Sequence, residues 1–166
     1  MTNYSTSQIH SLGILIVFTF YFIFQIKSLF KSLGKRSLLK RHNTLKKLKR
    51  LSWDDFELLC MEFFEKQQWS AKGNTVKGAD GGVDIWMDKR SFQKKTTAIV
   101  QCKRYDETPV SIKVIREMYG LMYEYEVDKA FIVTTSYFTK ECYKFVEGKN
   151  IELINGTQLV KMINSL

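Results

Sequence analysis

Two segments decide how this chain folds: residues 78–84, GADGGVD, and residues 99–103, IVQCK. The first is a glycine-rich turn that leads into Asp84, and glycine adopts the backbone conformations of tight turns without strain. The second is typical of a β-strand, in which Gln101 and Lys103 share one face. If the two strands pair as a hairpin, Asp84 lies on that same face. A carboxylate, an amide oxygen and an ammonium group then come together.

This combination indicates phosphodiester hydrolysis. Hard oxygen donors are the ligands that Mg²⁺ prefers, and a bound metal polarises the phosphoryl group and lowers the pKa of the attacking water. A neighbouring lysine stabilises the charge that develops in the transition state. Each residue alone also has a structural explanation, since Asp84 could end a turn and Gln101 could be a solvated strand residue. Their combination with Lys103 and the glycine turn favours a catalytic site.

These residues resemble the Mrr-type restriction endonucleases, a branch of the PD-(D/E)xK nuclease superfamily in which glutamine replaces the second acidic ligand and gives QxK. The resemblance covers about Leu51 to Ile163 and includes WDDFE at 53–57, QCKRY at 101–105 and FIVTTS at 131–136. It implies an α/β fold in which a restriction-endonuclease-like mixed β-sheet is flanked by helices. In this chain a transmembrane helix is expected to precede that domain.

By position, the resemblance implies that Asp84 is the principal metal ligand, Gln101 a neutral ligand and Lys103 the charge stabiliser or the activator of water. Glu57 would be a carboxylate of the first helix near the metal, although a glutamate in the first turns of a helix also compensates the helix dipole. Asp80 either shapes the glycine turn or lies near the metal. The implied cofactor is Mg²⁺, with Mn²⁺ as an alternative, and the implied partner is DNA.

Six further residues are weaker candidates for DNA contact. Four lie in a basic turn between the two strands, which could grip DNA or could be an ordinary solvated loop: Lys89, Arg90, Lys94 and Lys95. The other two, Arg104 and Tyr105, follow the QxK strand. Tyr105 could contact phosphate or could pack, as tyrosines that follow strands usually do.

The apolar pattern predicts the remaining elements of the domain. Ser52 as N-cap, with Asp55 three residues later, begins an amphipathic helix. Strands are expected at 83–87, 97–103, 130–134 and 151–154, and further helices from Pro109 to Met122, after Thr139 and around 159–163. The strand, helix, strand order from 97 to 134 predicts a right-handed crossover and a parallel pair within a mixed sheet.

The N-terminus differs from this domain. Residues 1–26 contain no charged side chain, and 12–24 are apolar on every helical face, which is typical of a membrane helix. Residues 9–30 span a bilayer if Lys27 reaches the headgroups. We therefore expect 1–8 as a short tail and 9–30 as an uncleaved transmembrane helix. A signal peptide is disfavoured because no basic residue precedes the run and no small-x-small site follows it; a buried hairpin is the other alternative.

The net positive charge of the chain comes from one segment. Of the 26 Lys and Arg residues, ten lie within 27–50 with no acid among them, which leaves 16 against 17 Asp and Glu in 51–166. Positive charge beside a membrane span is retained on the cytoplasmic side. Residues 31–50 are therefore expected as a basic juxtamembrane linker, and 51–166 as a nuclease domain on the cytoplasmic side of the inner membrane. The same charges could also bind anionic lipid or nucleic acid phosphates.

Composition limits the remaining classes. A chain of 166 residues has room for one domain and an appendage, and 45% hydrophobic residues with a single proline exclude a collagen-like or wholly disordered chain. Cys60, Cys102 and Cys142 are far apart and without CxxC spacing. We therefore expect buried free thiols rather than a disulfide framework or a zinc site.

These observations predict a membrane-anchored, Mg²⁺-dependent DNA endonuclease that hydrolyses phosphodiester bonds, a Mrr-type deoxyribonuclease of the type II or IV kind. Restriction of foreign DNA is the role that the resemblance implies. Cutting both strands requires two active sites, which favours a homodimer. Two alternatives stay open: a nuclease fold without turnover that tethers DNA to the membrane, and a membrane interaction module that binds lipid and protein.

The distribution of charge predicts the topology of the chain. Because ten bases follow an uncharged apolar run, a reporter that is active only in the cytoplasm should be active when fused after Leu166. A periplasmic reporter fused at the same point should be silent. The opposite pair of results would reverse the expected orientation.

Overall fold

The computed structural model describes residues 37–74, 82–92 and 94–166. The expected tail at 1–8 and the expected transmembrane helix at 9–30 lie outside the described residues. Within the described part, no helix is long and apolar enough to cross a membrane. The membrane anchor therefore stays a prediction.

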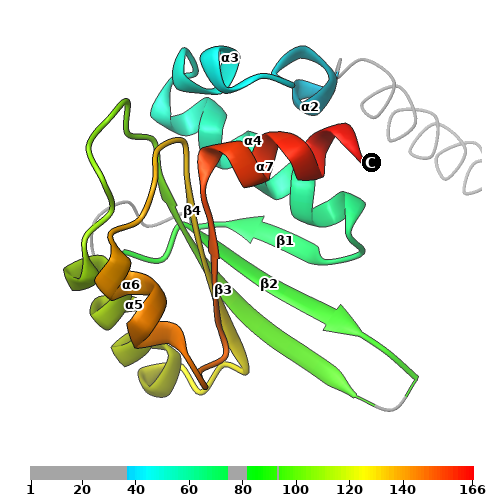
Figure 1. Ribbon diagram of the computed structural model, residues 1–166. Helices are drawn as coiled ribbons and strands as arrows, with labels where there is room; N and C mark the ends of the chain where they lie inside the picture. Colours follow the sequence, from blue (N-terminus) through cyan, green and yellow to red (C-terminus); the bar gives the residue numbers. More distant parts are fainter. Residues whose placement is uncertain (1–36, 75–81, 93) are drawn as a thin grey trace, which may run out of the picture. The chain divides into compact units, whose positions relative to one another are not determined.

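The described residues form a five-stranded mixed sheet with the order β1-β2-β3-β4-β5 (Figure 1). Its strands are β1 (Ser70–Gly73), β2 (Ile85–Arg90), β3 (Lys95–Lys103), β4 (Lys129–Thr134) and β5 (Ile151–Ile154). The pairs β1–β2 and β2–β3 are antiparallel, whereas β3–β4 and β4–β5 are parallel. The predicted hairpin, the parallel pair and the mixed sheet are therefore confirmed. Strand β1 was not predicted.

Helices cover both faces of this sheet. They are α2 (Leu38–Arg41), α3 (Leu45–Lys49), α4 (Trp53–Lys66), α5 (Ile112–Glu124), α6 (Lys140–Val146) and α7 (Gly156–Asn164). The predicted cap of α4 is confirmed, because the Ser52 hydroxyl accepts a hydrogen bond from the Asp55 N–H at 3.1 Å. Helices α4 and α7 pack on one face, and α5 and α6 pack on the other (Figure 1).

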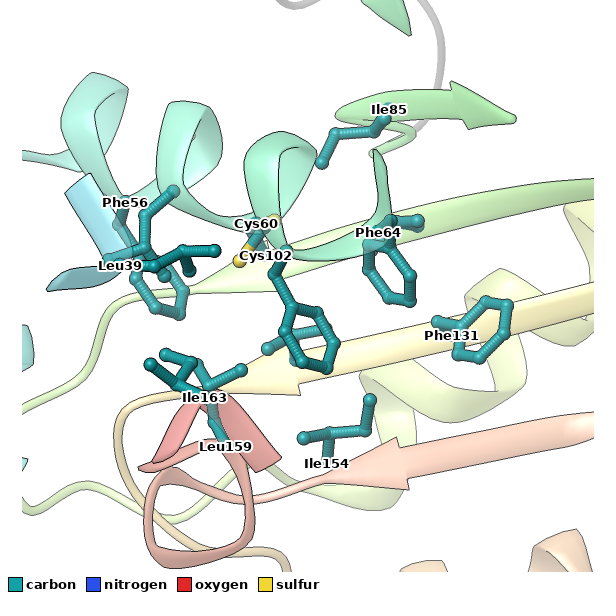
Figure 2. Packing of buried hydrophobic residues seen from close by; sticks show 14 of the residues in the cluster. Leu39, Phe56, Cys60, Phe64, Ile85, Cys102, Phe131, Ile154, Leu159 and Ile163 are labelled. Carbon is teal, nitrogen blue, oxygen red and sulfur yellow. The ribbon is translucent and has the colours of Figure 1, made fainter. Parts of the chain in front are cut away.

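Alternation along β3 divides the core into two clusters. Val100 and Cys102 point toward α4 and α7, where Phe64 and Phe131 pack with their ring centroids 4.8 Å apart (Figure 2). Ile99 points to the α5 side. The three cysteines are buried and free, as the sequence predicts. Because Gln101 alternates with Cys102 along the strand, its side chain leaves the sheet on the face opposite α4.

The basic segment is folded against the domain wherever the structure describes it. Leu39, Leu48 and Leu51 are buried in the core beside α4 and α7, and the Leu38 N–H donates to the Glu62 carboxylate at 2.8 Å. The compact unit begins at Ser37, earlier than the boundary at Leu51 that the sequence suggests. These leucines lie among lysines and arginines, so the charge of the segment concealed their apolar positions.

This packing predicts a stability effect within the basic segment. Leu48→Ala should lower the free energy of unfolding by about 2–5 kcal/mol, because it leaves a cavity in the core. Denaturant unfolding of the full chain measures the effect. Leu58→Ala, which truncates an exposed leucine of α4, is the matched control and should change stability by less than about 0.5 kcal/mol. Equal stability of the two variants would make residues 37–50 a linker after all.

Candidate active site

The start of β2 meets the end of β3 at Asp84. The register pairs Ile85 with Val100, and the Asp84 N–H donates to the Val100 carbonyl oxygen at 2.9 Å. Oδ2 of Asp84 accepts a hydrogen bond from the Cys102 N–H at 2.6 Å. The Asp84 carboxylate is thereby held against β3, opposite Gln101.

Gln101 is buried and incompletely hydrogen-bonded. Its side chain is 2% exposed, and Oε1 has no hydrogen-bond partner among the described residues. Its Nε2 lies so close to Gly82 that a Cβ at position 82 would collide with it, and Gly82 has a φ of +104°. The backbone conformation therefore favours glycine at position 82, and a Cβ there would force the end of the Gln101 side chain to shift. The amide oxygen is buried without a partner among the described residues.

Lys103 supplies a positive charge at the same end of the sheet. Burial raises the pKa of the Asp84 carboxyl above its usual 3.8, while the Cys102 N–H and the Lys103 charge partly oppose that rise. The Lys103 Nζ also lies 5.6 Å from the centroid of the Trp53 ring. Trp53, 39% exposed, is the site neighbour that sequence reasoning missed. An exposed tryptophan in the first turn of a helix was the available signal.

Glu57 comes from α4, the helix that packs against Cys102. It lies on α4, half-buried, one turn before Cys60. A hydrogen bond to Cys60 and burial raise the pKa of the Cys102 thiol well above its usual range, and the charges of Asp84 and Glu57 raise it further. Figure 2 shows the two thiols side by side between α4 and β3. Both carboxylates therefore lie near Cys102, with Glu57 on its α4 side.

The donor set determines which metal these residues suit. Among the residues that the structure describes, no group of three or more His, Cys, Asp and Glu side chains could hold a metal ion. The available donors are the Asp84 carboxylate and the unpartnered Gln101 Oε1, with Glu57 nearby. Mg²⁺ fits such a set, because it binds one or two carboxylates and keeps several waters or substrate phosphates. Residues 75–81, which include Asp80, lie outside the described residues.

The basic turn between β2 and β3 is remote from this site. Arg90 lies six positions after Asp84, which is about 20 Å along an extended strand, and the turn projects from the opposite end of the hairpin (Figure 1). Lys94 lies 3.2 Å from an Asp128 carboxylate oxygen, and Lys89 donates to a backbone carbonyl. The structure does not bring the four basic candidates to the site: Lys89, Arg90, Lys94 and Lys95.

Arg104 and Tyr105 lie beside the site and make structural contacts. Nη1 of Arg104 donates to the Lys49 carbonyl oxygen at 3.0 Å and is 3.5 Å from the Asp106 carboxylate. The ring of Tyr105 is half-buried against the core on the α5 side. Its carbonyl oxygen accepts a hydrogen bond from the Thr135 hydroxyl at 2.6 Å. Both residues therefore help to hold the loop that follows β3.

Comparison with solved structures supports the fold. The chain resembles the DNA modification-dependent restriction endonuclease AspBHI, with a TM-score of 0.62 and 19% identity over 73% of this chain and 34% of that one. It also resembles FokI bound to DNA, with a TM-score of 0.52 and 17% identity over 73% and 26%. A third relative, a protein of unknown function called AF1548, has a TM-score of 0.52 and 15% identity over 66% and 65%.

These likenesses concern one domain, since the chain matches about a third of AspBHI and a quarter of FokI. No curated protein matches the sequence. The family model Mrr_cat, described as restriction endonuclease, matches residues 48–163. That range contains all four candidate catalytic residues, Glu57, Asp84, Gln101 and Lys103, and most of the chain. The chain therefore belongs to the restriction endonuclease family Mrr_cat.

Proposed function

We propose that this chain is a Mg²⁺-dependent DNA endonuclease that hydrolyses phosphodiester bonds. The observation that carries the proposal is the meeting of three groups at one end of the β2–β3 hairpin. They are the half-buried Asp84 carboxylate, the Gln101 Oε1 that has no partner among the described residues, and the Lys103 ammonium. Membership of a restriction endonuclease family makes DNA the substrate that best fits this arrangement.

Each residue contributes separately to the proposed reaction. Mg²⁺ bound at this site would activate water and polarise the phosphoryl group, and Mn²⁺ prefers the same oxygen donors. Asp84 offers a charged ligand oxygen, since the hydrogen bond from Cys102 goes to its Oδ2. Gln101 offers a neutral oxygen, so the site repels the phosphodiester less than it would with a carboxylate at that position. Lys103 stabilises the negative charge that grows on the phosphate oxygens, and Glu57 provides a second carboxylate from α4.

The proposed setting is the inner membrane. The uncharged apolar segment 9–30 and the bases that follow it support a single-pass anchor with the nuclease domain in the cytoplasm. Restriction of foreign DNA suits a nuclease in that position. Since each chain carries one such site, a homodimer would supply the two sites that a double-strand break requires.

Two substitutions separate metal binding from catalysis. Lys103→Ala should lower the rate of plasmid cleavage about 100- to 1000-fold at saturating Mg²⁺, because one preorganised electrostatic contact is lost, and should leave Mg²⁺ affinity largely unchanged. Asp84→Asn should abolish cleavage and weaken Mg²⁺ binding, because the ligand charge is removed. Initial rates of plasmid nicking and calorimetric titration with Mg²⁺ measure the two effects.

A matched control uses the same strand. Lys95→Ala removes one lysine charge from the opposite end of β3 and should cleave at the wild-type rate. If the wild-type chain shows no Mg²⁺-dependent cleavage of plain, methylated or single-stranded DNA, the nuclease proposal fails. A nuclease fold that only binds DNA would then be the better interpretation.

The buried charge of Asp84 predicts a pH-dependent stability. Because its pKa in the folded state is raised above 3.8, the stability that protonated Asp84 contributes is complete below about pH 3.8 and is lost as the pH rises through the raised value. Without metal, Asp84→Asn should therefore unfold at a higher temperature than wild type at pH 7. The gain should shrink as the pH falls toward 4. Destabilisation at pH 7 would mean that the bond from Cys102 outweighs the cost of burial.

A further inference from the structure

A hollow of about 450 Å³ opens beside the candidate active site, at the ends of β3 and β4. Its walls come from α3, from the segments that follow β3 and β4, and from the first residues of α7, in the upper half of Figure 1. Thr135, one of the wall residues, donates its N–H to the Lys103 carbonyl oxygen at 3.2 Å. The hollow therefore lies one hydrogen-bonded contact away from the proposed active site.

One wall residue carries an unsatisfied hydroxyl. Ser136 is 9% exposed, and its Oγ has no hydrogen-bond partner among the described residues. The backbone of Ser136 is held on both sides, since its N–H donates to the Thr134 hydroxyl at 3.1 Å and its carbonyl oxygen accepts the Gly156 N–H at 3.0 Å. A buried polar atom without a partner commonly indicates a missing ligand or water. The Ser136 backbone is thus fixed in place, and its hydroxyl is buried in the wall of the hollow without a partner among the described residues.

The other side chains of the wall indicate the kind of ligand. Tyr137 is 55% exposed and offers an aromatic face, Lys49 offers a positive charge, and Glu107 and Asp106 offer carboxylates, of which Asp106 also lies 3.5 Å from Arg104. Two carboxylates disfavour a phosphate group. A nucleobase fits these side chains better. Its amino groups can donate to carboxylates, and its carbonyl and ring nitrogen acceptors can accept from lysine. Its π-face can stack on tyrosine.

The start of α7 also favours a base over a phosphate. Anions bind at helix N-termini because backbone N–H groups there lack partners. In α7 the Gly156 N–H already donates to Ser136, and the Gln158 N–H donates to the Asn155 side chain at 2.9 Å. Two of the groups that would hold a phosphate are therefore engaged within the protein.

We propose that this hollow binds a nucleobase that has left the base stack of the DNA strand held at the active site. The proposal rests on the proposed nuclease function, because the catalytic residues bring the strand to this edge of the sheet. The volume lies within the usual range for small-molecule sites, and Tyr137 can stack only on a base whose face is free. The enzyme would accordingly prefer DNA with an unpaired, mismatched or extruded base near the cleaved bond.

The test measures the DNA affinity of the full chain in detergent and EDTA, where no cleavage is expected. Fluorescence anisotropy compares three probes: a paired duplex, the same duplex with one mismatch, and its single strand. Tyr137→Ala should weaken binding of the mismatched duplex and the single strand about 5- to 100-fold, through loss of base stacking, and should leave the paired duplex within about twofold. Ser136→Ala should weaken the same two probes about 3- to 10-fold.

Tyr123→Ala is the matched control, since Tyr123 is an exposed tyrosine of α5 outside the hollow, and all three affinities should stay at the wild-type value. If Tyr137→Ala weakened the binding of all three probes equally, Tyr137 would contact the DNA backbone rather than a base, and the proposal would be wrong. Wild-type affinities for that variant would overturn the proposal outright.

Plasmid cleavage distinguishes this proposal from the nuclease proposal. If wild type cleaves DNA while Tyr137→Ala binds every probe like wild type, the base site is wrong and the nuclease function stands. If wild type does not cleave but Tyr137→Ala selectively loses the unpaired probes, the nuclease function fails and the base site stands. If wild type binds none of the probes, the base site is wrong, and plasmid cleavage alone decides the nuclease function.

Discussion

The hydrogen bond from the Cys102 N–H to Oδ2 of Asp84 is the contact on which the candidate site depends. This bond is 2.6 Å long and joins the residue that precedes β2 to the second-to-last residue of β3. Because its donor is a backbone group, the position of the carboxylate is set by the pairing of the two strands. Gln101 and Lys103 flank that donor in the sequence, so the same bond determines where the carboxylate lies relative to both.

This arrangement places polar groups where folding alone would not favour them. Burial raises the pKa of Asp84, and the Gln101 Oε1 lacks a partner among the described residues. The rest of β3 compensates, since Ile99 and Val100 are fully buried in the two core clusters. Perturbed and unsatisfied groups that meet at the end of a well-packed sheet are typical of a functional site. The packing of the rest of the sheet therefore offsets the free energy that these polar groups cost.

Local sequence patterns predicted much of the domain, but they predicted neither strand β1 nor the packing of α2 and α3. The Ser52 cap, the β2–β3 hairpin and the β4 strand were predictable because each signal depends on neighbours in the sequence. Strand β1 reads SAKG and has no apolar alternation, so only pairing with β2 identifies it. Helices α2 and α3 hide two core leucines within a basic run. Because charge is the dominant feature of that run, the local pattern predicted a basic juxtamembrane linker.

The sequence by itself determined that Asp84, Gln101 and Lys103 meet on one face, because strand period and hairpin pairing are local properties. It could not determine that the Gln101 oxygen is left without a partner, nor that a hollow forms beside Lys103. The segment before α3 and the end of α7 meet where Asn164 donates to the Asn43 carbonyl oxygen, 121 residues away. Burial and hydrogen-bond satisfaction depend on which distant surfaces pack together, and only the tertiary structure decides that.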